Sequence, residues 1–188
     1  MKTKNILLAI LILLISIDKI QAQDTLIRNS VYVSPFVGLN TNLKAPVYGA
    51  EVGYEFRLNQ KWGFTAGINI AYTQKNYPAY GSVTPKQKFL QNAMFGGAKY
   101  YLGKFYISAE LGYEDAYRTN TSKDAATDVS YSYGTYATNS LYQAYGIGYQ
   151  LPLKKGDNLE FFTKAAHANQ NTNCVIGFRY GFGLFRRK

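Results

Sequence analysis

Apolar and polar side chains alternate strictly along residues 105–114, which is the clearest pattern in the chain. The apolar parity consists of Phe105, Ile107, Ala109, Leu111 and Tyr113. The opposite parity carries two glutamates and a glycine: Glu110, Glu114 and Gly112. A period of two residues is typical of a β-strand whose faces meet different environments. Glycine has no packing reason to face water but fits a narrow interior, so the pattern predicts an apolar face toward lipid and a polar face toward the lumen of a small barrel.

The same period recurs along the chain and predicts eight strands. They are residues 31–39, 47–58, 62–73, 87–102, 105–117, 139–151, 159–168 and 174–184. Strands of about ten residues match the tilted crossing of a bilayer. The sequence therefore predicts an all-β fold, an eight-stranded antiparallel up-and-down transmembrane β-barrel.

The connections between these strands are expected to alternate in length. Those after Leu58, Leu102 and Leu151 are short, whereas most of those at the other end of the barrel are longer. The longest is residues 118–138, which is rich in Thr, Ser, Asp, Ala and Tyr and is predicted to be an exposed, mobile loop. Short periplasmic turns and long outer loops are typical of outer-membrane barrels, so this loop is expected outside the cell.

Shared parity also predicts which side chains lie on the outside of the barrel. The lipid-facing set is Tyr48, Val52, Ile68, Ile107, Leu111, Ile147 and Phe178. Aromatic residues near strand ends suit the girdles at the two membrane interfaces. This interface set is Trp62, Tyr72 and Tyr113.

Charged residues of both signs fall on the inward parity. They are Glu51, Glu55, Arg57, Lys99, Glu110, Glu114, Glu160, Lys164 and Arg179. An unpaired buried charge is costly, so these groups are expected to pair as an ionic network that fills the lumen. The interior of an eight-stranded barrel is just wide enough to be filled by side chains, which argues against a porin. A catalytic carboxylate pair or a selective pore is the functional alternative.

The N-terminus has the features of a secretory signal peptide. Lys2 and Lys4 precede an apolar run over residues 6–15, and Ala22 supplies a small residue at the exit. The run is too short for a spanning helix, and a retained N-terminal anchor is the alternative. Residues 1–22 are thus predicted to be a cleaved signal peptide, and residues 23–188 a single outer-membrane barrel domain.

The net charge of +10 is spread along the chain, with one basic cluster at residues 186–188. For an exported chain, anionic lipid headgroups or lipopolysaccharide are the expected counterparts, and no nucleic acid is expected. The single cysteine, Cys174, excludes an intrachain disulfide and lies on the predicted lipid face, where a small apolar role is expected.

The sequence offers little for catalysis. The only histidine, His167, is followed by Ala168 and Asn169, with no serine close in sequence for a Ser-His-acid group. The pairs of glycines around Ile147 and Phe182 do not open a helix, as a nucleotide-binding loop would. No catalytic residue, metal ligand or cofactor is therefore predicted.

Three segments carry a resemblance to a known family. The hairpin at residues 99–105, the following Ser-Ala-Glu-Leu-Gly-Tyr at residues 108–113 and the closing Gly-Phe-Arg-Tyr-Gly-Phe at residues 177–182 resemble the small outer-membrane β-barrel proteins common in Bacteroidetes. These proteins are similar in architecture to OmpA/OmpX-type barrels. The resemblance covers essentially the whole predicted mature chain and implies residence in the outer membrane of a Gram-negative cell.

Two classes of function follow, and a third is more distant. The first is a non-enzymatic integral outer-membrane barrel, with a plugged polar lumen and exposed loops that contact the envelope or a partner protein outside the cell. Its expected surroundings are outer-membrane lipid, and it is expected to be a monomer. The second is an outer-membrane enzyme that modifies lipid, and the third is a secreted soluble barrel that binds a ligand.

Overall fold

The computed structural model describes residues 29–153 and 157–184, and the predicted signal peptide, residues 1–22, lies outside them. The described chain forms eight strands. They are β1 (Asn29–Asn40), β2 (Ala45–Arg57), β3 (Trp62–Asn76), β4 (Val83–Leu102), β5 (Phe105–Asp124), β6 (Ser130–Pro152), β7 (Asn158–Ala168) and β8 (Asn171–Gly183).

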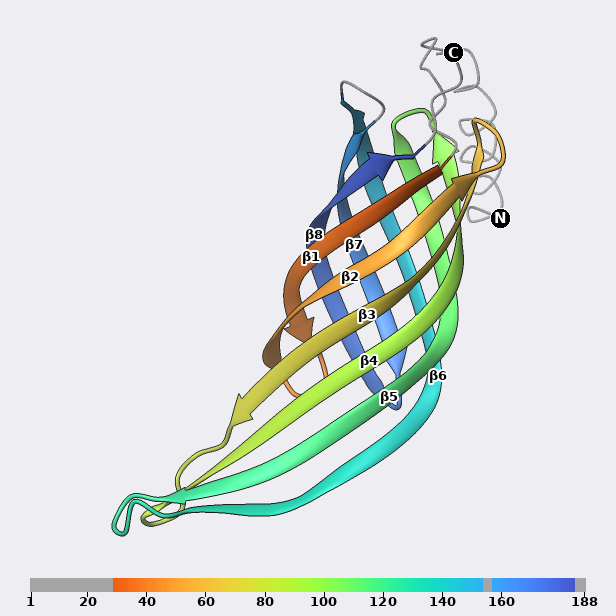
Figure 1. The fold of residues 1–188 in the computed structure, drawn as a ribbon. Helices are drawn as coiled ribbons and strands as arrows, with labels where there is room; N and C mark the ends of the chain where they lie inside the picture. The colour runs from red at the N-terminus through yellow and green to blue at the C-terminus, as the bar shows by residue number, and fades with distance from the viewer. Residues whose placement is uncertain (1–28, 154–156, 185–188) are drawn as a thin grey trace, which may run out of the picture.

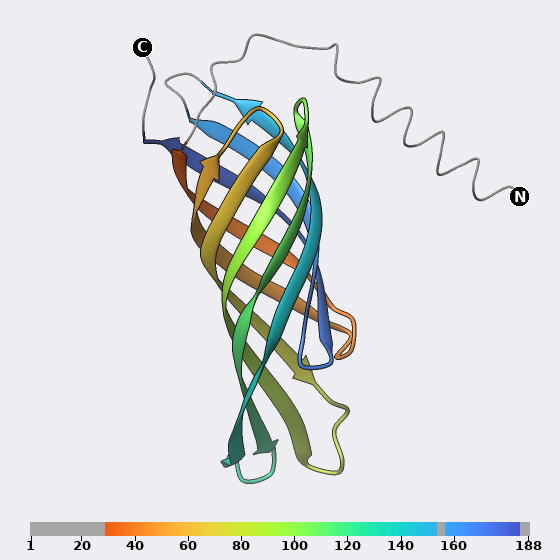
Figure 2. The same ribbon diagram turned by 90° about the vertical axis from the view of Figure 1, so that its right-hand side faces the viewer.

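Each strand pairs antiparallel with its neighbour in chain order, and β1 also pairs with β8, which closes the sheet into a barrel (Figure 1). The predicted all-β, eight-stranded, up-and-down antiparallel barrel is thereby confirmed. The barrel is slanted, with strongly tilted strands, as Figure 2 shows from the side. Within the described residues, no helix is long and apolar enough to cross a membrane.

Tight turns join the strands at several points. Gly103, with a positive φ of 70°, begins the two-residue turn that joins Leu102 to its pairing partner Phe105. At the opposite end, Asn169 and Gln170 both have positive φ values and join β7 to β8. Two successive residues with positive φ define the turn type whose twist matches that of the flanking strands, and asparagine tolerates this conformation well.

The prediction that residues 118–138 form a loop is wrong. Strand β5 continues to Asp124 and β6 begins at Ser130, so most of this segment is a paired β-hairpin. The expected connection at residues 74–86 likewise shrinks to residues 77–82. Most residues of the polar segment are exposed or half-buried on both faces, so it has no alternating pattern. Its Thr and Tyr residues still favour extended backbone.

The lengthened strands project beyond the rest of the barrel as an extension, here called the arm and comprising residues 74–90 and 115–140 (Figure 1). It lies at the end opposite to Asn29 and Gly183, the first and last strand residues. Strands β4, β5 and β6 run along its length, whereas β7 ends earlier, at Ala168. The chain therefore has a closed barrel region and an open, sheet-like region.

Glycines make room for the rings that fill the barrel. A Cβ on Gly148 would lie 2.3 Å from the Tyr106 ring, and one on Gly53 would lie 2.4 Å from the Tyr32 hydroxyl. Both tyrosines are buried in the lumen. The inward glycines thus have the packing reason that the sequence pattern suggested, because a small barrel lacks space for two side chains at these points.

Candidate functional site: the polar lumen and the arm

The barrel wall places all nine charged residues of the predicted network on its inner face. Eight of them are at most 7% exposed, and the side chain of Arg57 is 14% exposed. They come from five of the eight strands, so their contacts cross the lumen as well as following neighbouring strands. The charged groups fall into two connected layers, followed by a third layer that is mostly uncharged.

The first layer lies near the end of the barrel that holds the termini of the described chain. Lys99 Nζ is 2.6 Å from Glu55 Oε2 and 2.8 Å from Glu160 Oε2, so one ammonium group binds two carboxylates. Tyr101 donates its hydroxyl hydrogen to Glu55. The Arg57 guanidinium lies over the Tyr101 ring, 3.6 Å from its centroid.

The second layer is centred on Glu51. This carboxylate receives Lys164 Nζ and Arg179 Nη2, each at 2.6 Å. Lys164 also binds Glu110 at 2.9 Å, and the Arg179 Nη1 atom lies 3.6 Å from Glu160 of the first layer. Ser34 accepts a hydrogen bond from Arg179 Nε at 3.0 Å. The two layers therefore form one continuous ionic cluster.

The prediction that Glu114 belongs to the ionic network is wrong, because Glu114 forms no ion pair among the described residues. Its partner is the neutral Gln91, which donates an amide hydrogen at 3.0 Å. The chain of amides continues from Asn173 to Gln91 and from Asn40 to Asn173, each at 2.8 Å. The amide residues lie on the same inward-facing parity as the charged residues, so the sequence pattern could have identified them as lumen residues. Their contacts across the lumen depend on how the strands are aligned with one another, which the sequence of a single strand does not show.

Most side chains that point into the barrel are buried. A cavity of about 10 Å³ lies between the second and third layers, beside Glu114, Tyr142 and Lys164. That volume holds about one water molecule. Within the described parts of the chain, no group of His, Cys, Asp or Glu could hold a metal ion.

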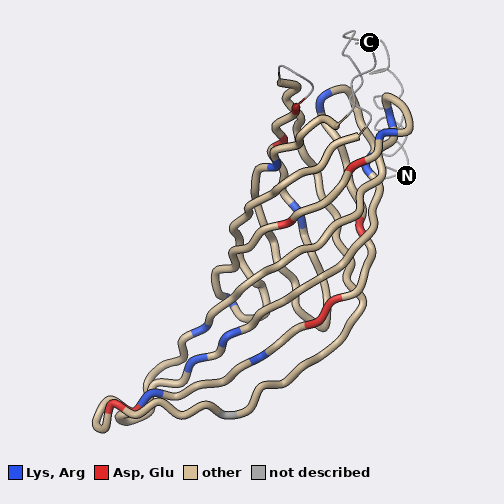
Figure 3. The backbone as a smooth tube through the Cα atoms, in the orientation of Figure 1, with Lys and Arg blue, Asp and Glu red and all other residues tan. Residues whose placement is uncertain are grey.

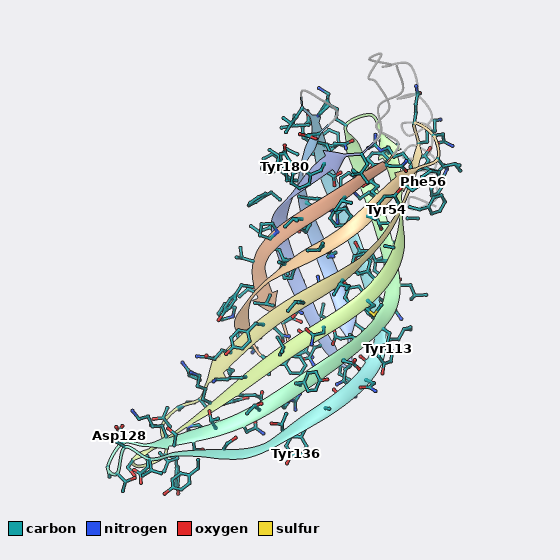
Figure 4. The ribbon with its side chains drawn as sticks, in the orientation of Figure 1. Tyr54, Phe56, Tyr113, Asp128, Tyr136 and Tyr180 are labelled. Atoms are coloured by element: carbon teal, nitrogen blue, oxygen red, sulfur yellow. The ribbon has the colours of Figure 1, made fainter. Side chains whose placement is uncertain are left out.

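The outer surface of the barrel is apolar. All seven side chains of the predicted lipid-facing set lie on it, with exposed fractions between 47 and 59%. Figure 4 shows side chains projecting outward from the wall, with the exposed Tyr54 and Phe56 of β2 labelled. A water-exposed protein rarely presents a continuous apolar patch of more than a few hundred Å².

Aromatic side chains gather at two levels of this surface. Trp62 packs edge-on against Tyr100 with ring centroids 4.9 Å apart, and Tyr72 packs against Tyr48 at 5.4 Å. Trp62 and Tyr72 are ten residues apart on β3, which corresponds to about 25 Å along the axis of a barrel with strands tilted by about 40°. This separation matches the height of the apolar band in outer-membrane barrels. Tyr113 is 50% exposed and lies beside Leu141, close to the level where β7 ends.

His167 and Cys174 both lie on exposed positions. The Nδ1 atom of His167 is 2.9 Å from the hydroxyl of Thr172 across the β7–β8 turn. Cys174 pairs in register with Leu39 and Ala165 on its two neighbouring strands.

The arm carries a different set of charges (Figure 3). Basic residues prevail along its strands, namely Lys75, Lys86, Lys88, Arg118 and Lys123. At its tip Lys123 binds Asp128 at 2.6 Å, but the two side chains are 61 and 82% exposed. The Asp124 carboxylate accepts a hydrogen bond from the backbone N–H of Ala126 at 2.9 Å, which holds the pKa of Asp124 below its usual value.

Comparison with known proteins gives the class of fold. No protein-family model and no curated protein matches the chain. Among solved structures, the attachment invasion locus protein Ail of Yersinia pestis, in complex with the heparin analogue sucrose octasulfate, is similar with a TM-score of 0.52 and 12% identity, covering 82% of this chain and 99% of that one. CarO of Acinetobacter baumannii gives a TM-score of 0.49 and 11% identity over 86% of this chain and 100% of that one. The outer-membrane enzyme PagL gives 0.42 and 12%, over 81 and 99%. The fold is that of the small eight-stranded outer-membrane barrels.

Proposed function

We propose that this chain is a non-enzymatic integral protein of the Gram-negative outer membrane, with a sealed lumen and an arm that stands outside the cell. The observation that carries the proposal is the inverted distribution of side chains. The ion pairs are buried inside the barrel, while Leu111, Ile147 and their neighbours are exposed on its outside. In water this arrangement would leave a large apolar surface hydrated, whereas in lipid it buries that surface.

The proposed orientation places the termini of the described chain in the periplasm and the arm outside. Its support is the known asymmetry of bacterial barrels, whose periplasmic turns are short. The turns at residues 58–61 and 103–104 lie at the end with the termini, and the arm lies at the other. The predicted export through a signal peptide agrees with this orientation.

The arm is the part of the proposed protein that would contact the envelope surface or molecules outside. Lys86 and Lys88 lie on β4 just beyond the pair formed by Leu90 and Tyr72. The Leu90–Tyr72 pair belongs to the outer aromatic level, so these lysines would reach the anionic headgroups of the outer leaflet. In this proposal the barrel lies in outer-membrane lipid, and the arm extends beyond the outer leaflet as an open, polar sheet.

The proposal is tested by expressing the chain in a Gram-negative host. We expect the protein to remain in the outer-membrane fraction after carbonate extraction, to migrate differently on gels before and after heating, and to give no stable conductance in planar bilayers. A large, steady, porin-like conductance would contradict the sealed lumen. Release by carbonate would instead favour the secreted soluble barrel.

A lipid-modifying enzyme is the competing function, and the contact between His167 and Thr172 is the place to test it. Purified protein would be incubated with labelled lipid A and phospholipid, with His167→Ala as the matched variant. Product formed by the original chain and lost in His167→Ala would replace the non-enzymatic proposal.

A further inference from the structure

One edge of the arm has no neighbouring strand. Strand β6 begins at Ser130 but pairs with β7 only from Gln143 onward. Within the described part of the chain, residues 130–142 pair with β5 as their one neighbouring strand, so the backbone groups on their other edge have no ladder partner. The side chain of Asn169, in the β7–β8 turn, donates a hydrogen bond to the Thr138 hydroxyl at 2.6 Å and leaves these backbone groups unpaired. Both faces of this segment are also exposed over most of its length.

The direction of these free groups follows from the ladder. Gln150 donates its backbone N–H to Lys104 at 2.7 Å, which makes this cross-strand pair a hydrogen-bonded one. Hydrogen-bonded pairs alternate along an antiparallel ladder, so even-numbered residues of β6 turn toward β5 as far as the irregularity opposite Thr119 and Asn120. The N–H and C=O groups of Thr135, Ala137 and Asn139 consequently point to the free edge.

This edge lacks the usual protection against another strand. Natural edge strands carry charged residues, prolines or very short lengths, which disfavour edge-to-edge pairing. Residues 130–142 contain no charged residue and no proline, although the adjoining strands of the arm carry Lys86, Lys88 and Arg118. Tyrosine and threonine, which favour extended strands, make up much of the segment.

We propose that the free edge of β6 pairs antiparallel with the same edge of a second copy of this chain, inserted in a facing membrane. The proposal rests on the proposed function, because it requires the arm to stand outside the cell. An uncharged edge is self-complementary, since no like charges meet when two copies approach. A two-fold pairing of identical edges is an isologous interface that closes on itself.

Membrane geometry selects the facing copy over a neighbour in the same membrane. Two copies inserted side by side have the same orientation, so their β6 strands both run from the arm tip toward the lipid and would meet in parallel. Copies in facing membranes present strands that run in opposite directions, as antiparallel pairing requires. Many copies on each surface act together, so a weak single pairing suffices to hold two cells.

The first test mixes two cell populations that carry different fluorescent proteins and have truncated lipopolysaccharide. We expect mixed clumps only when both populations express the chain. Ala137→Pro removes one free-edge N–H without removing a bond to β5, and we expect it to abolish clumping. Ala79→Pro, in the exposed connection between β3 and β4, is the matched control and should leave clumping intact.

The second test locates the pairing. In this segment the backbone groups on the free edge belong to odd-numbered residues, so an odd-numbered residue of one copy must lie opposite an odd-numbered residue of the other. In an antiparallel pair of identical strands with this register, one residue lies opposite the same residue of the other copy. In a Cys174→Ala background, single cysteines are placed in turn at positions 135 to 139. We expect one of these variants to give a disulfide-linked dimer in clumped cells.

Each other outcome overturns the inference. Clumps that include non-expressing cells would mean that the edge binds a different molecule, and cross-linked dimers without clumps would mean pairing within one membrane. Neither clumps nor dimers would mean that the edge stays free. A membrane-impermeant maleimide applied to the same cysteine variants separates the two proposals, because absence of labelling on intact cells contradicts the outward arm itself.

Discussion

Strands β4, β5 and β6 pass through two regions of the molecule, the closed barrel and the arm, and the same backbone ladder is supported differently in each. In the barrel every strand has two neighbours, and side chains from opposite walls meet at the axis. In the arm the sheet is open, both faces of the outer part of β6 meet solvent, and one edge is free.

Two ion pairs of equal length allow the barrel and the arm to be compared directly. Lys164 of the barrel and Lys123 of the arm each place an ammonium group 2.6 Å from a carboxylate. The first pair is buried, with its carboxylate fully covered, and the second is mostly exposed. Equal distances therefore carry different free energies, because desolvation and screening depend on the surroundings and not on the separation alone.

The largest expected effect comes from removing a buried cation. Lys164→Met should lower the free energy of unfolding by about 3–5 kcal/mol, because it leaves Glu51 and Glu110 short of a partner in a closed lumen. Lys123→Met, the matched change in the arm, should cost about 0–1 kcal/mol. Urea titration in detergent or bilayer measures both. Equal losses in the two variants would mean that the lumen is hydrated like the surface.

The outer surface gives the second contrast. Leu111→Arg should cost about 2–4 kcal/mol if the side chain lies near the midplane of the bilayer. The control is Thr84→Arg on an exposed position of β4 in the arm, where we expect a change within about 0.5 kcal/mol. Unfolding from lipid vesicles is the required measurement, since detergent removes the depth dependence. A tolerated arginine at position 111 would contradict the lipid-facing assignment.

The sequence predicted the barrel better than the arm for a physical reason. In the barrel the two faces of each strand meet different surroundings, so residues such as Glu51 and Val52 report their direction by parity alone. In the outer part of the arm most residues of both faces meet solvent, so neither face selects for a residue class. Residues 118–138 were therefore predicted to be a loop. The free edge of β6 could be found only after the lengths of β6 and β7 were known together.

The alternation of inward and outward residues also could not predict which charged side chains pair within the lumen. Glu110 and Glu114 have the same parity on one strand, yet Glu110 binds Lys164 while Glu114 binds the neutral Gln91. What separates them is their height along the barrel, which depends on the stagger of all eight strands. Among the described residues of the lumen, no basic side chain pairs with Glu114, and amide side chains lie at that height instead.

Removing the outer part of the β5–β6 hairpin should have a smaller effect on the barrel than Lys164→Met or Leu111→Arg. Replacing residues 119–135 with Asn-Gly joins Arg118 directly to its partner Tyr136 by a two-residue turn. We expect the shortened chain to fold and to keep its heat-modifiable migration, since a shorter connection costs less closure entropy. The control places Asn-Gly at Gly103 and Lys104, where a two-residue turn already exists. Failure of only the arm deletion to fold would show that the arm nucleates the barrel.

The smallest effect is expected at the tip of the arm and depends on pH. The pKa of Asp124 is lowered chiefly by the hydrogen bond that its carboxylate accepts from the Ala126 N–H, and Ser82 and Thr127 add to the effect. A lowered pKa in the folded state means that the contribution is complete above the ordinary aspartate value and is lost as the pH falls through the folded value. Amide exchange at Ala126, corrected for intrinsic rates, should therefore lose protection as the pH falls below the ordinary aspartate range. Asp124→Asn is the matched variant and should show weaker protection at neutral pH with little further change on acidification. Protection that stays constant in the original chain over this range would mean that the turn is held by its backbone bonds alone, such as the one from Asp124 N–H to Val129.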